Sequence, residues 1–280
     1  MPPQIERAAG KRHILRFDRF DRILHGFLML SFLGLAATGL PLLFSEAAWA
    51  GKLARVLGGF YVTHRLHRIF ATTMIVVFLT HVGRLLNRVI LKKDYSIFWG
   101  PGSMVPQPTD LSDMYHHLRW FVGLGERPRF DRFTYWEKFD YWAVFWGMAI
   151  IGGSGLLLWF PETFALIVPG WVFNIALLIH GEEALLAVGF IFTIHFFNSH
   201  LRPEKFPMDM VIFTGRVEER EWKEEREAEY DRVARAPVFS PQVVPAPSHR
   251  LWLAGRIIGT SAVVVGLTLV GLIIYALIRG

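Results

Sequence analysis

The chain contains no cysteine and few charged residues. The absence of cysteine excludes disulfides, iron–sulfur clusters held by thiolates of this chain, and covalent haem attachment through a Cys-x-x-Cys-His motif. Asp, Glu, Lys and Arg make up only 19% of the 280 residues, whereas 52% are hydrophobic. This composition is too apolar for a typical soluble domain and indicates an integral membrane protein.

Five apolar stretches reach the roughly 20 residues that a helix needs to cross the hydrocarbon core of a bilayer. The sequence therefore predicts an all-α integral membrane protein, with a bundle of four transmembrane helices and a fifth helix at the C-terminus. The first stretch is too long for the apolar region of a secretory signal, which has about 7–15 residues, so we expect it to be retained. The five stretches are Ile23–Phe44, Phe60–Leu91, Tyr141–Phe160, Trp171–His200 and Ile257–Ile278.

Lysine and arginine are concentrated on alternate connections between these stretches. There are six in 1–22, seven in 92–138 and nine in 201–250, against two in 45–60 and none in 161–170. The positive-inside rule then predicts a cytoplasmic N-terminus and a C-terminus outside. Because this excess of positive charge is explained by membrane topology, it does not indicate nucleic-acid binding.

The chain divides by composition into three parts. Residues 1–215 form the predicted membrane domain, with a cytoplasmic loop at 92–138 that should contain a short helix near 111–121. Residues 216–250 are a charged cytoplasmic segment, expected to form a solvated helix at 217–234 and an extended proline-rich linker at 237–247. Residues 251–280 are the C-terminal transmembrane helix. No internal repeat is evident beyond the histidine spacing described next.

Histidines recur at matched spacing inside two of the apolar stretches. His67 and His81 are 14 residues apart, and His180 and His195 are 15 apart. At about 1.5 Å rise per residue, each pair spans about 21–22 Å of helix. Two facing helices with this pattern place imidazoles at two depths of one bundle, which suits two stacked haems of the b type, each bound from both sides.

His67 and His180 are both near the outer ends of their helices, so they should share one metal. For the inner metal His195 is the candidate ligand from the fourth helix, and depth alone leaves its partner open between His25 and His81. On an α-helix His200 lies about 140° from His195, so it should face elsewhere. We expect His64 at the membrane interface and ordinary surface positions for His116, His117 and His249.

Charged residues inside the spans are costly and often functional. Arg65 and Arg68 flank His67 and could contact haem propionates, and Arg84, with Arg88, could do so near His81. Glu182 and Glu183 follow His180 and could handle the protons of a quinol.

At these residues the chain resembles the bacterial cytochrome b561 family, specifically the formate dehydrogenase gamma subunit and the cytochrome b of nickel hydrogenases. The similarity covers roughly residues 16–215 and is carried by Arg16–His25, Thr38-Gly39-Leu40-Pro41-Leu42, His67-Arg68-Ile69, His180 and His195. The resemblance implies two haems, held by His67 with His180 and by His25 with His195. It also implies a quinone site near the cytoplasmic haem, location in the bacterial inner membrane, and electron exchange with a periplasmic or membrane-associated subunit carrying iron–sulfur clusters or multiple c haems. His81 departs from the family pattern and could replace His25, line the quinone site or support a third haem.

The leading hypothesis is a multihaem b cytochrome, embedded in membrane lipid, that transfers electrons between a quinone pool and a redox partner as the quinone-reactive subunit of an oxidoreductase complex. The rival hypothesis is a proton or solute transporter that uses Glu182, Glu183 and the buried histidines as a relay. The rival explains the intramembrane acids but not the paired spacing.

Overall fold

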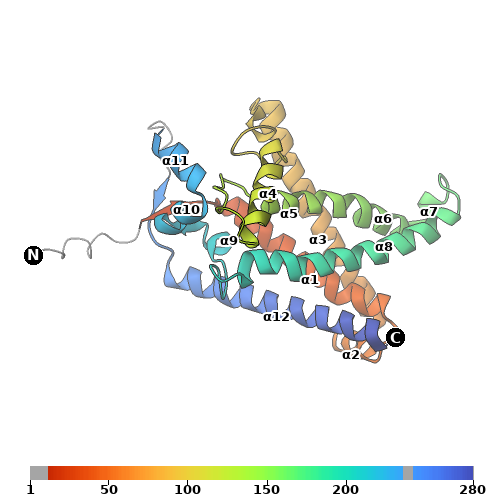
Figure 1. Cartoon of the computed structure of the whole chain (residues 1–280). Helices are drawn as coiled ribbons and strands as arrows, with labels where there is room; N and C mark the ends of the chain where they lie inside the picture. The colour runs from red at the N-terminus through yellow and green to blue at the C-terminus, as the bar shows by residue number, and fades with distance from the viewer. Residues whose placement is uncertain (1–11, 236–241, 280) are drawn as a thin grey trace, which may run out of the picture. The chain divides into compact units, whose positions relative to one another are not determined.

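The structure is a computed structural model that describes residues 12–235 and 242–279 (Figure 1). About 74% of the chain is helical, which agrees with the predicted all-α class. Five helices are long and apolar enough to cross a membrane, and they coincide with the five predicted stretches. Their bounds are Arg19–Leu43, Phe60–Leu91, Tyr135–Trp159, Trp171–Leu201 and His249–Arg279.

Several of these helices extend beyond the stretches predicted from hydropathy. The third begins six residues earlier than expected, at Tyr135, and the fifth begins at His249 rather than at Ile257. The difference has a simple cause. Hydropathy marks the segment that enters hydrocarbon, whereas the backbone hydrogen bonds of a helix continue into the polar interface.

The chain forms two compact units. Unit 1 contains Met1–Arg22, Arg84–Ala143 and Met210–Gly255, and unit 2 contains Ile23–Gly83, Val144–Asp209 and Arg256–Gly280. Unit 1 therefore brings together parts of the three segments that the charge distribution predicts on one side of the membrane.

Unit 2 consists of most of the long apolar helices. Its core is a cluster of buried side chains around Phe192, which packs edge-on against Phe32 at 5.6 Å between ring centres. The elements with residues in unit 2 are α1 (Arg19–Leu43), α2 (Ala48–Val56), α3 (Phe60–Leu86), α5 (Tyr135–Gly147), η3 (Met148–Gly152), α6 (Gly153–Trp159), α7 (Pro161–Phe164), α8 (Trp171–Phe190), η4 (Ile191–His195), η5 (Phe197–Leu201) and α12 (His249–Arg279).

The helices η3, η4 and η5 have π-helical backbone, with hydrogen bonds from residue i to i+5. Such segments hold more residues per turn than an α-helix. Side chains five apart consequently lie closer to the same face than the 100° step of an α-helix predicts.

Unit 1 contains a small antiparallel sheet that the prediction of an all-α fold did not include. The strand order is β2-β1-β3, and His13 of β1 pairs with Glu218 and with Val244. The elements of unit 1, besides the first turns of α1, α5 and α12, are β1 (His13–Leu15), η1 (Asn87–Leu91), η2 (Tyr95–Ile97), α4 (Pro108–Phe121), α9 (Val211–Thr214), β2 (Arg216–Glu218), α10 (Glu219–Glu225), α11 (Glu227–Arg235) and β3 (Val243–Val244).

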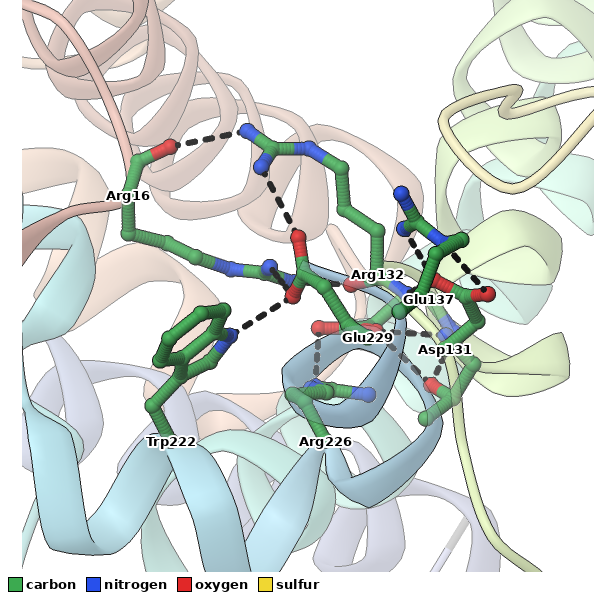
Figure 2. Close-up of polar contacts among 9 residues, drawn as sticks. Arg16, Asp131, Arg132, Glu137, Trp222, Arg226 and Glu229 are labelled. Carbon is green, nitrogen blue, oxygen red and sulfur yellow. Dashed lines mark hydrogen bonds and ion pairs between the residues drawn. The ribbon is translucent and has the colours of Figure 1, made fainter. Parts of the chain in front are cut away.

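The charged segment 217–234 does not form the single solvated helix that was predicted. It starts in β2 and then forms two helices separated by a break at Arg226. Glu229 is only 4% exposed, because it accepts hydrogen bonds from Arg16 at 2.9 Å, from Arg132 at 3.2 Å and from Trp222 at 2.8 Å (Figure 2). Burial lowers the pKa of Arg16 to about 10, against the opposing charge of Glu229, so its guanidinium stays protonated at neutral pH.

The predicted extended linker lies partly outside the described residues, which omit 236–241. Its described part includes β3, which pairs with β1. His117, expected at the surface, is buried at 7% exposure. Its ring stacks on Phe121 at 4.4 Å and its Nδ1 lies 3.1 Å from the hydroxyl of Tyr135, because α4 packs on the start of α5.

Candidate cofactor site between the membrane helices

His67 of α3 and His180 of α8 face each other within unit 2. Their ring centres are 6.3 Å apart and the ring planes are inclined at 77°. A transition metal bound by two trans imidazole nitrogens at about 2.0–2.1 Å each would place the nitrogens about 4 Å and the ring centres about 6 Å apart. The separation of the rings therefore fits one metal shared by the two histidines.

Each of these histidines is held through its Nδ1 atom by the neighbouring helix. His67 Nδ1 lies 3.0 Å from the hydroxyl of Thr38 on α1. His180 Nδ1 lies 3.2 Å from the hydroxyl of Ser154 on α6 and 3.0 Å from the carbonyl of Ile151. The carbonyl of Leu35 also interacts with His67, as that of Ile151 does with His180.

The hydrogen bonds of the hydroxyls define the tautomer of each imidazole. Thr38 donates its single hydroxyl proton to the carbonyl of Gly34 at 2.6 Å, and Ser154 donates its proton to the carbonyl of Ile150 at 2.7 Å. With the hydroxyl protons placed in this way, the hydroxyl oxygens accept from the histidines. The carbonyls of Leu35 and Ile151 can only accept, so we assign a proton to each Nδ1. The Nε2 lone pairs remain for a metal, which is the usual arrangement when the other ring nitrogen of a histidine ligand donates to a neighbouring oxygen.

Two glycines give these imidazoles their space. A Cβ atom on Gly39 would lie 3.1 Å from Cε1 of His67, and one on Gly155 would lie 3.0 Å from Cε1 of His180. Three other glycines, Gly26, Gly83 and Gly181, lie within two residues of a histidine of the spans. A Cβ on Gly26 or Gly83 would meet no described atom within 4 Å, and one on Gly181 would meet Leu43.

The residues that hold the histidines form a short internal repeat, which sequence reasoning missed. Thr38-Gly39-Leu40-Pro41-Leu42-Leu43-Phe44 and Ser154-Gly155-Leu156-Leu157-Leu158-Trp159-Phe160 match at the hydroxyl, the glycine, the next leucine and the terminal phenylalanine. Each copy lies on the helix before a histidine helix and supports the histidine that follows. This repeat could have been found in the sequence, because its two copies occupy corresponding positions in the two halves of the bundle.

A second group of histidines lies deeper along the same helices. His25 of α1 interacts electrostatically with His195 and His200. His25 precedes Thr38 by 13 residues, which is about 20 Å along a helix. The imidazoles therefore occupy two depths in the bundle, as the spacing predicted.

His200 is not turned away from His195 as α-helical geometry predicted. It is 7% exposed, and it interacts with His195 and His25. The π-helical winding of η4 and η5 explains the difference, since five residues complete more nearly one turn there. His81 lies with its ring 6.1 Å from that of Phe145. The structure thus places His81 against α5, and His25 within electrostatic range of His195.

The arginines predicted to contact propionates have several kinds of partner. Arg65 lies over the ring of Tyr61 at 5.1 Å and Arg68 over that of Trp159 at 5.3 Å. Arg84, in unit 1, forms ion pairs with Asp18 at 2.9 Å and Asp21 at 2.8 Å. These carboxylates give Arg84 a structural role in fixing the start of α1.

Glu182 and Glu183 lie less than one turn from His180 on α8. Glu182 is exposed, and Glu183 is half-buried and accepts a hydrogen bond from the indole of Trp146 at 3.3 Å. Among the described residues, no group of three or more His, Asp or Glu side chains is placed to hold a metal ion.

The chain was also compared with known proteins. No family model and no curated protein matches it.

Proposed function

We propose that this protein is a membrane-bound b-type cytochrome that transfers electrons between a quinone pool and a redox partner. The observation that carries the proposal is the facing pair of His67 and His180, with both Nδ1 atoms anchored and ring centres 6.3 Å apart. A bound haem would supply one-electron redox chemistry; the chain supplies ligands, orientation and an apolar surrounding.

We assign His67 and His180 as the ligands of one haem, and His25 and His195 as the ligands of a second. The electrostatic interaction of His25 with His195 supports the second pair, and His81 remains the alternative ligand or the ligand of a third haem. Two sites about 20 Å apart along the bundle would divide the membrane crossing into shorter transfers.

Quinol oxidation or quinone reduction also requires a group that exchanges protons. Glu183, held by Trp146 beside His180, and the exposed Glu182 are our candidates for that role. Arg65 and Arg68, at the same end of α3 as His67, are candidates for holding haem propionates. The electron partner would be a periplasmic or membrane-associated subunit that contains iron–sulfur clusters or c haems, with the chain in a bacterial inner membrane.

The test is haem content in purified protein. We expect a reduced-minus-oxidised spectrum of b-type haem and about two haems per chain by pyridine haemochrome. His67→Ala and His180→Ala should each remove one haem, and the same spectral component should disappear in both. His64→Ala is the matched control, because His64 is exposed one turn before His67. A folded, membrane-inserted wild-type protein that binds no haem would overturn the proposal.

A further inference from the structure

Helix α4 carries an apolar face that no described residue covers. Met114 is 39% exposed, and the other members of this face are between 55% and 69% exposed. We define the α4 face as Leu111, Met114, Tyr115, Leu118, Phe121 and Val122. With about 100° per residue, these positions fall within an arc of about 120° on one side of the helix.

The rest of the helix surface is divided between a buried side and a polar side. Asp110 and His117 are buried against α5, where Asp110 forms an ion pair with Lys138 at 2.8 Å. Ser112, His116 and Arg119 are exposed together on the third side. The exposed surface of α4 is thus itself amphipathic, with an apolar stripe beside a polar one.

Helix α4 contacts the start of the third of the five candidate membrane spans. Its buried side packs on the first turn of the membrane helix that begins at Tyr135, and Figure 1 shows α4 crossing the start of α5 at a steep angle. The indole of Trp142, one turn further along α5, donates a hydrogen bond to the carbonyl of Met104 at 3.0 Å. The loop before α4 therefore lies beside Trp142, near the start of that candidate span.

The surroundings of α4 have the composition of a membrane interface. Tyr95, Phe98 and Trp99 are 50–68% exposed, and Lys92 and Lys93 are exposed at the end of the second span. Aromatic rings and lysines of this kind are enriched where lipid headgroups meet the hydrocarbon.

We propose that α4 lies in the plane of the membrane, with the α4 face buried at the boundary between lipid headgroups and acyl chains. The polar stripe then faces water. Such a helix stays at the interface by burying apolar area while its polar side chains remain solvated. This inference depends on the membrane spans and not on haem.

The test uses site-directed spin labels in nanodiscs that contain phosphatidylcholine and phosphatidylglycerol. The chain has no cysteine, so single substitutions can be labelled without background. In Leu118→Cys and Val122→Cys, we expect the label to collide with lipid-soluble oxygen and to be protected from a water-soluble nickel chelate. Ser112→Cys and His116→Cys, on the polar side of the same helix, are the matched controls and should show the reverse.

Two results would overturn the proposal. Equal access of the nickel chelate to positions 118, 122, 112 and 116 would mean that the α4 face is in water. Protection of positions 118 and 122 from both reagents would mean that protein, such as a second copy or a partner subunit, covers the face instead of lipid.

Discussion

At the scale of single residues, Thr38 and Ser154 hold the two facing histidines in place through contacts with their Nδ1 atoms. Each hydroxyl oxygen accepts from an Nδ1–H, which makes the imidazole more electron-rich at Nε2. A ligand of this kind favours the oxidised metal. Under the proposed function, loss of either hydroxyl should therefore raise the reduction potential of the metal that the two histidines would bind.

We accordingly expect Thr38→Val and Ser154→Ala to raise the midpoint potential of the same haem component in an equilibrium redox titration. Thr38→Ser should restore the wild-type value. Thr73→Val is the control, because the Thr73 hydroxyl bonds only the carbonyl of Ile69 in its own helix. Shifts in two different components would contradict a shared metal, and unchanged potentials in both variants would contradict the role of the hydroxyls.

The glycine beside His180 offers a second prediction for a single residue. In Gly155→Ala the new methyl group would lie 3.0 Å from Cε1 of His180, so the imidazole must move away from its position opposite His67. We expect weaker binding of one haem, seen as a lower haem-to-chain ratio. Gly153→Ala, two residues earlier on α6, meets no described atom within 4 Å and should retain wild-type haem content. Equal haem content in both variants would show that Gly155 does not limit the site.

At the scale of elements, the fifth helix is bound to the bundle by a close contact rather than being a loose anchor. A Cβ on Gly266 of α12 would lie 2.6 Å from Phe196 and 2.7 Å from Phe192, whose side chain is 1% exposed and has no room to move. Overpacking of this type costs about 1–3 kcal/mol. We expect Gly266→Ala to lower the thermal midpoint of the protein in detergent micelles.

Gly271→Ala is the control for that variant, since a Cβ there meets no described atom within 4 Å. It should leave the midpoint unchanged or raise it slightly, because alanine is the better helix former. A similar decrease in both variants would indicate a general effect of the added methyl group instead of the contact with Phe192 and Phe196.

Elements differed in how well the sequence predicted them. Hydropathy located all five membrane helices, because about 20 apolar residues in a row have few other uses. It did not locate the small sheet or the break at Arg226, because Glu229 is buried by partners that are distant in sequence, Arg16 and Arg132. The π-helical segments could not be predicted, because the sequence-based prediction assumed the α-helical rotation of 100° per residue. For that reason the predicted direction of His200, away from His195, was wrong. By contrast, His67 and His180, which face each other in the structure, were predicted as partners from their matched depth near the outer ends of their helices.

At the scale of the whole molecule, three segments far apart in sequence are joined by charge. Glu229 connects the tail to Arg16 near the N-terminus and to Arg132 before α5, with side-chain exposures of 5% for Glu229 and 7% for Arg16. Removal of one partner from a buried ion pair costs about 3–5 kcal/mol.

We therefore expect Glu229→Gln to destabilise unit 1 and to make residues 216–235 much more sensitive to limited proteolysis. Glu224→Gln is the control, because its ion pair with Arg220 is exposed and exposed pairs contribute little to stability. Equal protease resistance of the two variants would show that the Glu229 network does not hold the tail in place.

The assembly of these three segments into unit 1 also constrains the membrane topology. Residues before α1, between the second and third spans, and between the fourth and fifth spans share unit 1, so each must be separated from the next by an even number of crossings. Two spans lie between each consecutive pair. The lysines and arginines of these segments then predict that their side is the cytoplasm.

Cysteine labelling can test this arrangement, because the chain has no cysteine of its own. We expect an impermeant maleimide to label Arg12→Cys, Ser112→Cys and Arg220→Cys in inverted vesicles but not in intact spheroplasts. Lys52→Cys and Glu162→Cys, in the two connections on the other side, should label in spheroplasts. If positions 12, 112 and 220 label from different sides, the three segments cannot form unit 1 in the membrane. If all three label in spheroplasts and positions 52 and 162 do not, unit 1 is retained but the charge-based orientation is wrong.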